Sequence, residues 1–323
     1  MKLNKAQLSV LLGAVGAFTL LLGVTAVYPS LDDLWVENPF WNGLSEFYVE
    51  VKPLRMGGLS GLQNIMFPGN TTLFIIGPST DFSQEEAAWI RGYLHRGGTL
   101  VLADDFGTSN QLLEGLGVEA RFSGGLLKDP LFRDKSALLP ITLQTGYDGV
   151  ENIVFNYATV LTDIDGAEVK ALSSPFSVVE AVGGEPQPEA GSLPLVAELS
   201  VGEGKLVMVS DSSPFINSMI QKGDNRLLLR ALLTGEAVID EDHSIPSKLT
   251  AVKSQLAKAY TALGSLELRY GLALLMVAGV MAVRLDDGGE PVDEVEAVSG
   301  AHPEYDRGLV ERLYAERRRA RGE

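Results

Sequence analysis

The 323-residue chain contains no cysteine, and its only histidines are His95, His243 and His302. The absence of cysteine excludes disulfides, thiolate metal sites and cysteine nucleophiles. Because the three histidines are widely spaced, the pattern does not favour a histidine-based zinc site. None of them follows a strand that the sequence predicts, so the chain also shows no base for a serine hydrolase.

Basic residues are outnumbered, with 26 lysines and arginines against 42 aspartates and glutamates and a net charge of −16. Nucleic-acid binding depends on the neutralisation of phosphates, so we expect no nucleic-acid partner. The acidity is more typical of a domain that charge keeps soluble. The end of the chain differs, since an acidic link is followed by the basic stretch DRGLVERLYAERRRAR. That stretch predicts a helix near a membrane or a partner.

Two long uncharged runs are present. Residues Leu8–Val27 are long enough for a membrane span, and Lys2 and Lys5 precede them. The positive-inside rule then places the N-terminus in the cytoplasm, although Val24-Thr25-Ala26 is also compatible with signal-peptidase cleavage. The second run, Tyr270–Val283, is shorter and predicts either a second span or a buried helix.

These runs predict a protein of the cytoplasmic membrane with both termini in the cytoplasm and its main domain outside. The expected parts are an N-terminal transmembrane anchor (1–28), an extracytoplasmic α/β domain (29–245) with a β-rich insertion (118–190), a linking helix (246–265), a second transmembrane helix (266–285) and a charged cytoplasmic tail (286–323).

The segment Thr71–Gly107 predicts a strand, a helix and a second strand. Ser83 and Glu86 form a capping box at the start of the helix, and the strand Thr99–Ala103 ends at Asp104-Asp105. Apolar strands joined by an amphipathic helix indicate a parallel βαβ unit. Ligands bind to open α/β sheets at the carboxyl ends of the strands, so we expect the two aspartates at a functional edge.

Other segments extend this pattern on both sides. Glu46–Val51 is predicted as the first strand, Lys205–Val209 as the last, and Asn225–Leu233 as the helix that closes the domain. The short alternating segments of residues 118–190 indicate a β-rich insertion or an antiparallel extension of the sheet. Ser213 lies near Asp211, but the Ser-Pro pair is more typical of a helix start than of a nucleophile.

Polar residues at the predicted strand ends form a candidate ligand-binding set, which comprises Gly77, Pro78, Asp104, Asp105, Asp211, Ser212 and Asn225. Two alternatives stand for the three aspartates: they cap helices and accept hydrogen bonds from loop amides, or together they hold a divalent cation. We predict no catalytic residue and no cofactor. Asn70-Thr71-Thr72 is a candidate N-glycosylation sequon.

The chain resembles a family of prokaryotic, often archaeal, membrane-anchored proteins that carry a domain of unknown function. The resemblance covers roughly Leu31–Gly235 and rests on Asn38 with Trp41-Asn42-Gly43, FIIGPSTDFS, GGTLVLADDFG, GEGKLVMVSDSS followed by Asn217, and Gly223-Asp224-Asn225.

The resemblance implies a doubly wound, flavodoxin-like fold of the class I glutamine-amidotransferase-like type. Similar domains occur in auxiliary subunits of gliding-type ABC transporters and in intraflagellar transport proteins. Amidotransferases use a cysteine with a histidine and a glutamate, and this chain has no cysteine. The resemblance therefore implies the fold but not the amidotransferase activity.

We expect a non-enzymatic ligand- or partner-binding or scaffolding protein of the cell envelope, with a protein or a small polar ligand as its partner. A metal- or carboxylate-dependent hydrolase acting on envelope glycans is the first alternative. The second is an accessory subunit of a membrane transport or assembly complex.

Overall fold

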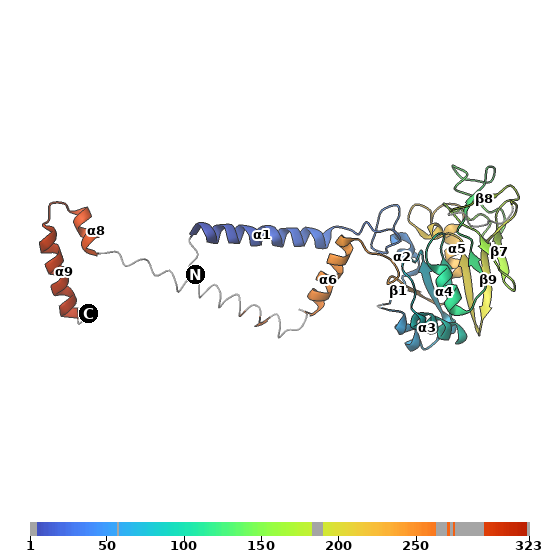
Figure 1. Ribbon diagram of the computed structural model, residues 1–323, viewed down its shortest axis with the longest axis horizontal. Coiled ribbons are helices and arrows are strands. Elements are labelled where there is room, and N and C mark those ends of the chain that lie inside the picture. Colours follow the sequence, from blue (N-terminus) through green and yellow to red (C-terminus); the bar gives the residue numbers. More distant parts are fainter. Residues whose placement is uncertain are drawn as a thin grey trace. The chain divides into compact units, whose positions relative to one another are not determined.

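A computed structural model describes residues 5–56, 58–182, 190–262, 270–271, 274 and 294–321 (Figure 1). The chain divides into two units, Met1–Ser254 and Gln255–Glu323. The first unit contains the sheet and the candidate site.

A seven-stranded mixed sheet organises the first unit, in the order β1-β11-β2-β3-β10-β9-β7. The first five strands of this order run parallel, and β9 and β7 extend the sheet antiparallel. Their bounds are β1 Leu54–Arg55, β2 Thr71–Ile76, β3 Thr99–Ala103, β7 Glu168–Leu172, β9 Pro194–Val201, β10 Gly204–Val209 and β11 Glu236–Ile239. The predicted α/β fold and βαβ unit are confirmed.

Side chains of the central strands alternate between two cores, one on each face of the sheet. On β2, Phe74 belongs to one core and Leu73 to the other, and Val101 and Leu100 of β3 divide in the same way. Because both faces are covered, these strands read as continuous apolar runs rather than as alternating ones.

Helices cover both faces. The face of Leu73 packs against η1 (Leu59–Asn64), α3 (Gln84–His95) and α4 (Ser109–Leu116), whose buried side chains share one core. The face of Phe74 packs against α2 (Ser45–Val51), η3 (Ser213–Phe215) and α5 (Asn225–Leu232). The predicted capping box of Ser83 and Glu86 opens α3.

The prediction of a strand at Glu46–Val51 is wrong, because Ser45–Val51 forms α2. Phe47 is buried and Val51 packs beside it in the same core, four residues apart on one helical face. Glu46 and Glu50 lie on another face and pair with Arg226 and Arg230 of α5. The alternating polar and apolar residues of this segment also fit the helical period. The choice between a strand and a helix therefore depends on packing against α5.

The sequence also missed β11, a four-residue strand that inserts between β1 and β2. The described residues of the range 118–190 combine both predicted arrangements. β7 extends the main sheet, and the remaining strands form two small antiparallel pairs. These pairs are β4 (Arg121–Phe122) with β6 (Leu161–Thr162), and β5 (Leu126–Lys128) with β8 (Val178–Glu180).

The first uncharged run forms α1 (Lys5–Val27). A membrane span requires about 20 consecutive apolar residues, and the described part of the chain offers no helix that is long and apolar enough. The prediction of a first transmembrane helix is therefore not supported. The predicted second span lies outside the described residues apart from 270, 271 and 274.

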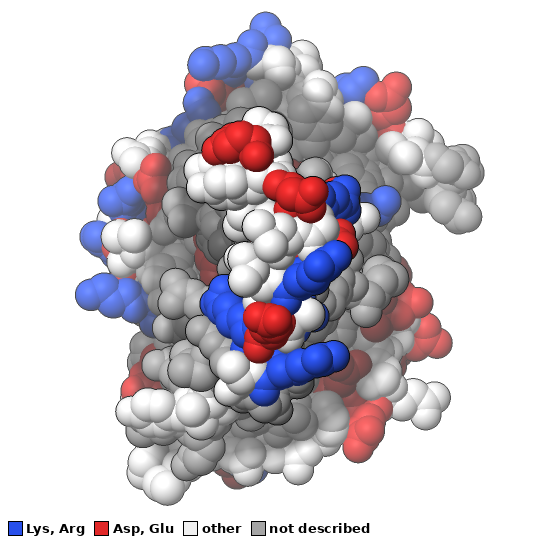
Figure 2. Space-filling model, turned by 90° about the vertical axis from the view of Figure 1, so that its left-hand side faces the viewer, with Lys and Arg blue, Asp and Glu red and all other residues white. Residues whose placement is uncertain are grey.

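Three further helices are α6 (Lys248–Ala262), at the predicted linking helix, and α8 (Glu294–Ala301) and α9 (Arg307–Arg321) of the tail. α9 confirms the predicted terminal helix. Its arginines are partly paired, Arg307 with Glu311 and Arg317 with Glu294 of α8. In the view of Figure 2, lysines and arginines are interspersed with aspartates and glutamates.

Candidate functional site

A pocket of about 370 Å³ lies at the carboxyl ends of the parallel strands. Gly77-Pro78-Ser79 follow β2, Asp104–Gly107 follow β3, and Ser212-Ser213 come shortly after β10, and all of them line it. Ligand sites of open α/β sheets are expected at this edge. A pocket is therefore present at the edge of the sheet where the sequence predicts a ligand site.

Residues from other segments complete the pocket and were not predicted. Asp33, Leu34, Trp41 and Asn42 come from the segment before α2, and Asn156 comes from the insertion. A second pocket of about 430 Å³ shares Asp33, Leu34, Gly77 and Ser79 with the first, and Ser244–Ser247 line its far side. The resemblance had singled out the Trp41 segment, but nothing in the strand pattern placed it here.

Asp104 holds the loop after β3 rather than facing a ligand. It is 2% exposed, and its carboxylate accepts N–H bonds from Asp105 (2.8 Å), Gly107 (2.9 Å) and Ser109 (3.0 Å). Burial raises the pKa of Asp104, against the lowering effect of these bonds. The side chain thus orders the turn into α4.

Asp211 is fully buried and joins the insertion to the sheet. Its carboxylate accepts N–H bonds from Asn156 (2.5 Å) and Ser213 (2.7 Å). Burial and the charge of Asp105 raise the pKa of Asp211 to about 8. Asp211 is therefore a neutral structural group at moderately acidic pH, and it does not line the pocket.

Asp105 also lines the pocket, and its carboxylate is less engaged with the backbone than that of Asp104. It is half-buried and accepts one N–H bond, from Phe106 (3.0 Å). Burial and the charge of Asp104 raise its pKa. Among the described residues it has no ion-pair partner, so its charge is available to a ligand.

Gly77, Pro78 and Ser212 lie at the pocket as predicted. Gly77 has a φ of +58°, and a Cβ there would collide with Leu34 Cδ1. The carbonyl of Pro78 accepts a bond from the N–H of Thr108 (3.1 Å). These residues shape the pocket through the backbone.

Asn225 does not reach the pocket. It is buried at the start of α5, where its side chain bonds the N–H (2.9 Å) and carbonyl (2.9 Å) of Val154. Asn70 lies at the opposite, amino end of β2, where it is exposed. Its glycosylation stays a prediction.

A three-aspartate cation site is not assembled. No group of three acidic or histidine side chains in the described parts of the chain is placed to hold a metal ion. The physical reason is that the carboxylate oxygens of Asp104 and Asp211 accept hydrogen bonds from backbone N–H groups.

A bonded loop carries Trp41 at the pocket. Buried Asn38 donates to the carbonyl of Asp32 (2.8 Å) and to Asn42 Oδ1 (2.9 Å). Asn217 donates to the carbonyls of Asn38 (3.1 Å) and Phe40 (2.6 Å). The loop is thus fixed from two sides, although Trp41 itself is 68% exposed.

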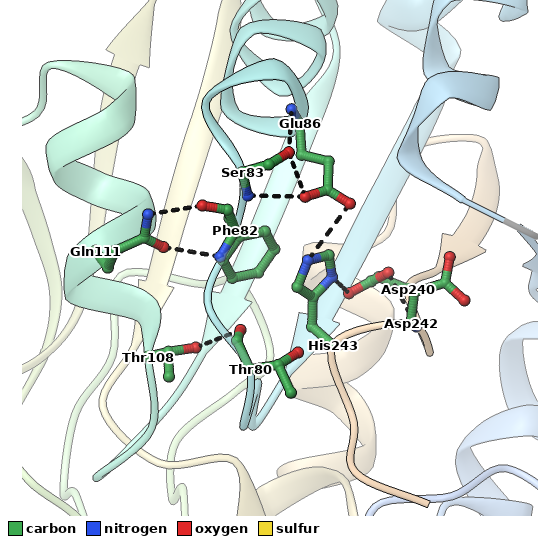
Figure 3. A network of polar contacts seen from close by, with 9 residues as sticks. All are labelled: Thr80, Phe82, Ser83, Glu86, Thr108, Gln111, Asp240, Asp242 and His243. Carbon is green, nitrogen blue, oxygen red and sulfur yellow. Dashed lines mark hydrogen bonds and ion pairs between the residues drawn. The ribbon is translucent and has the colours of Figure 1, made fainter. Parts of the chain in front are cut away.

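His243 corrects the view that no histidine follows a strand, because it lies shortly after β11. Figure 3 shows its ring between Asp240 and Glu86, with Nδ1 2.8 Å from Asp240 Oδ2 and Nε2 3.7 Å from Glu86 Oε1. The ring stacks on Phe82 with centroids 3.7 Å apart. His243 is 4% exposed and lines neither pocket, so it is placed to hold structure rather than to act as a base.

Solved structures of similar fold were found at low identity. The mmIFT52 N-terminal domain shares 14% identity over 55% of this chain and 82% of its own, with a TM-score of 0.44. A β-galactosidase from Bacillus circulans sp. alkalophilus shares 14% identity over 50% of this chain, with a TM-score of 0.33. Only 22% of the β-galactosidase chain is matched.

A cytoplasmic protein from Salmonella typhimurium LT2 shares 12% identity over 55% of this chain and 85% of its own, with a TM-score of 0.28. Such weak likenesses carry no argument about activity. No curated protein matches the sequence.

The sequence matches one family model over residues 37–233, which is more than half of the chain. The matched range begins just before the Trp41 loop and ends with α5. It therefore includes the strand-end loops and most of the pocket lining. The chain belongs to the family defined by the domain of unknown function DUF4350.

Proposed function

We propose that the protein is a non-enzymatic binding module whose carboxyl-edge pocket takes a small polar ligand or a polar group of a protein partner. The observation that carries the proposal is the contrast between Asp105 and its neighbours. Asp104 and Asp211 are buried and each accept at least two backbone N–H bonds, whereas Asp105 is only half-buried, accepts one such bond and lines the pocket together with the exposed ring of Trp41.

The reactive groups nearby support binding over catalysis. Ser213 Oγ lies 3.3 Å from the carbonyl oxygen of Asn156, to which it donates, and the buried His243 is held between two carboxylates. A nucleophile needs a base within hydrogen-bond reach. Among the described residues that line the pocket, we find no serine or threonine paired with a histidine.

The proposal is tested by a thermal-shift screen of the full chain against divalent cations, nucleotides, sugars and organic amines. A ligand of this pocket should raise the melting temperature of the wild type, and Trp41→Ala and Asp105→Asn should lose the shift. Phe67→Ala is the matched control, because Phe67 is 70% exposed at the opposite edge of the sheet. A shift that all three variants keep would contradict the proposed site.

One observation favours a second candidate, a carboxylate-dependent hydrolase. Asp105 lines the pocket with a pKa that burial and the charge of Asp104 raise, a property that general acids share. Turnover of glycan, ester or peptide substrates by the wild type, abolished in Asp105→Asn, would establish this candidate and overturn the non-enzymatic proposal.

Placement at the cytoplasmic membrane, and service as an accessory subunit there, are proposals that rest on the two uncharged runs and the basic tail of the sequence. Membrane fractionation of the full chain tests them. Recovery in the membrane pellet after alkaline carbonate washing would support the placement, and release into the supernatant would contradict it.

A further inference from the structure

We propose that the carboxyl-edge pocket recognises an organic cation, either a primary ammonium or a guanidinium group, between Asp105, Asp33 and the rings of Trp41 and Phe106. This inference rests on the proposed binding function and adds the chemical class of the ligand. It is drawn from the charge of the lining, the use of its hydrogen-bond donors and the exposure of its aromatic rings.

The charge of the lining has one sign. Asp33, Asp104 and Asp105 line the pocket, and no lysine, arginine or histidine does so among the described residues. Asp33 and Asp105 also lack an ion-pair partner within the described part of the chain. Phosphate and carboxylate ligands require positive charge or free N–H groups. The pocket therefore disfavours anions, which include nucleotides.

Three polar side chains of the lining donate their hydrogen bonds to neighbouring protein groups. Asn42 donates to Asp33, Asn156 donates to Ser213 Oγ (3.3 Å), and Ser79 donates to the carbonyl of Gly77 (3.4 Å). Carboxylate oxygens accept several hydrogen bonds each. The carboxylate oxygens of Asp33 and Asp105 thus keep acceptor capacity, which a donor-rich ligand satisfies.

Aromatic rings separate this pocket from a simple group of acids. Trp41 is 68% exposed and Phe106 is 47% exposed, and both line the pocket. Large exposed aromatic side chains in a concave site commonly mark recognition, and an ammonium or guanidinium is attracted to an aromatic face. Since Asn38 and Asn217 already fix the Trp41 loop, binding has to order only the side chain of Trp41 and not the backbone of the loop.

Repulsion between neighbouring carboxylates favours the binding of a cation. Burial raises the pKa of Asp105, the charge of Asp104 adds to that effect, and the charge of Asp105 acts in turn on Asp211. A cation next to Asp105 would stabilise its ionised form. The available volume of about 370 Å³ is enough for a charged head group with a short alkyl stem.

Calorimetric titration of the full chain at low salt tests the inference with two kinds of probe. Agmatine represents a free amine or guanidine, and the peptide acetyl-glycyl-arginyl-glycine amide represents a side chain of a protein partner. The same peptide with citrulline in place of arginine keeps the shape but removes the charge. We expect binding of a cationic probe and at least about tenfold weaker binding of its neutral counterpart, as for the loss of one charged hydrogen bond.

Variants then locate the binding. Asp105→Asn and Trp41→Ala should each weaken the cationic probe about tenfold or more. Glu203→Gln is the charge control, because Glu203 is an exposed acid at the opposite, amino end of β10. Phe67→Ala is again the aromatic control, and both controls should bind as the wild type does. Raising the salt concentration should weaken the interaction, because partly exposed charges are screened.

The outcomes separate this inference from the proposed function. Tighter binding of agmatine supports a small-molecule ligand, and tighter binding of the arginine peptide supports a protein partner. Equal binding of the citrulline peptide, or a sugar or nucleotide whose binding Trp41→Ala removes, overturns the cation inference and leaves the pocket a binding site. If no probe and no member of the thermal-shift screen binds, both the inference and the proposed function fail.

Discussion

At the scale of single residues, the aspartates that follow the strands have different tasks. Asp104 and Asp211 each accept at least two backbone N–H bonds, and the half-buried Asp105 accepts one and lines the pocket. The sequence shows three carboxylates of the same type, since the direction of a side chain at a strand end depends on the loop that follows.

Asp211→Asn should change how stability depends on pH. The folded pKa of Asp211 is raised from 3.8 to about 8 by burial and by the charge of Asp105. A raised pKa contributes stability that is present below the unfolded value and is lost as the pH rises through the folded one. Urea denaturation of the wild type should therefore show a decline between about pH 4 and 8, and the decline should be shallower in the variant. Parallel curves would contradict the buried, raised-pKa assignment.

Gly77→Ala should lower the free energy of unfolding by about 1–2 kcal/mol, because an alanine is strained at positive φ. Its Cβ would also press on Leu34, which lines both pockets. Urea denaturation gives the value. Gly92→Ala is the matched control of opposite sign, since Gly92 is helical with open space at its Cβ, and it should gain about 0.5–1 kcal/mol. Equal effects of the two substitutions would rule out the conformational explanation.

At the scale of elements, His243 connects the segment after β11 to the start of α3. Its backbone carbonyl accepts N–H bonds from Ser79 (2.7 Å) and Thr80 (3.2 Å), and its ring contacts Asp240, Glu86 and Phe82. Gln111 of α4 bonds both backbone groups of Phe82, as Figure 3 shows. Three elements are thus joined next to the pocket.

His243→Gln should remove a pH-dependent part of the stability. Burial lowers the pKa of His243, but the bond to Asp240 and the charges of Asp240, Glu86 and Asp242 outweigh it, so the folded pKa is raised above 6.5. The contribution is full below pH 6.5 and is lost as the pH rises through the folded value.

The difference in free energy of unfolding between wild type and His243→Gln should therefore shrink above neutral pH, as thermal or urea denaturation would record. His302→Gln, which replaces an exposed histidine of the second unit, is the control for a substitution outside the sheet. A difference that stays constant with pH would mean that His243 contributes by packing alone.

At the scale of the whole molecule, the sequence predicted the βαβ unit, the site edge and the terminal helix, because each has a strong local signal. α3 carries a capping box and an apolar face, and β3 carries a continuous apolar run. The prediction failed at α2 and β11. A seven-residue segment fits both periods, and a four-residue strand is too short to show one.

The candidate site was predicted in part for the same reason. Gly77, Pro78, Asp105 and Ser212 come from strand ends and lie together at the pocket. Asn225 also follows the pattern of a polar residue at an element boundary, yet it bonds Val154 and does not line the pocket. Sequence position alone does not say which way such a side chain points.

The sequence by itself determined the fold class, the edge of the sheet where ligands are expected and the absence of cysteine chemistry, since these follow from local periodicity and composition. Only the tertiary structure decided how many backbone bonds each aspartate accepts, that Trp41 and Phe106 line the pocket and that His243 is buried between carboxylates. Those contacts join segments far apart in the chain, and they form only when the two cores pack on opposite faces of the sheet.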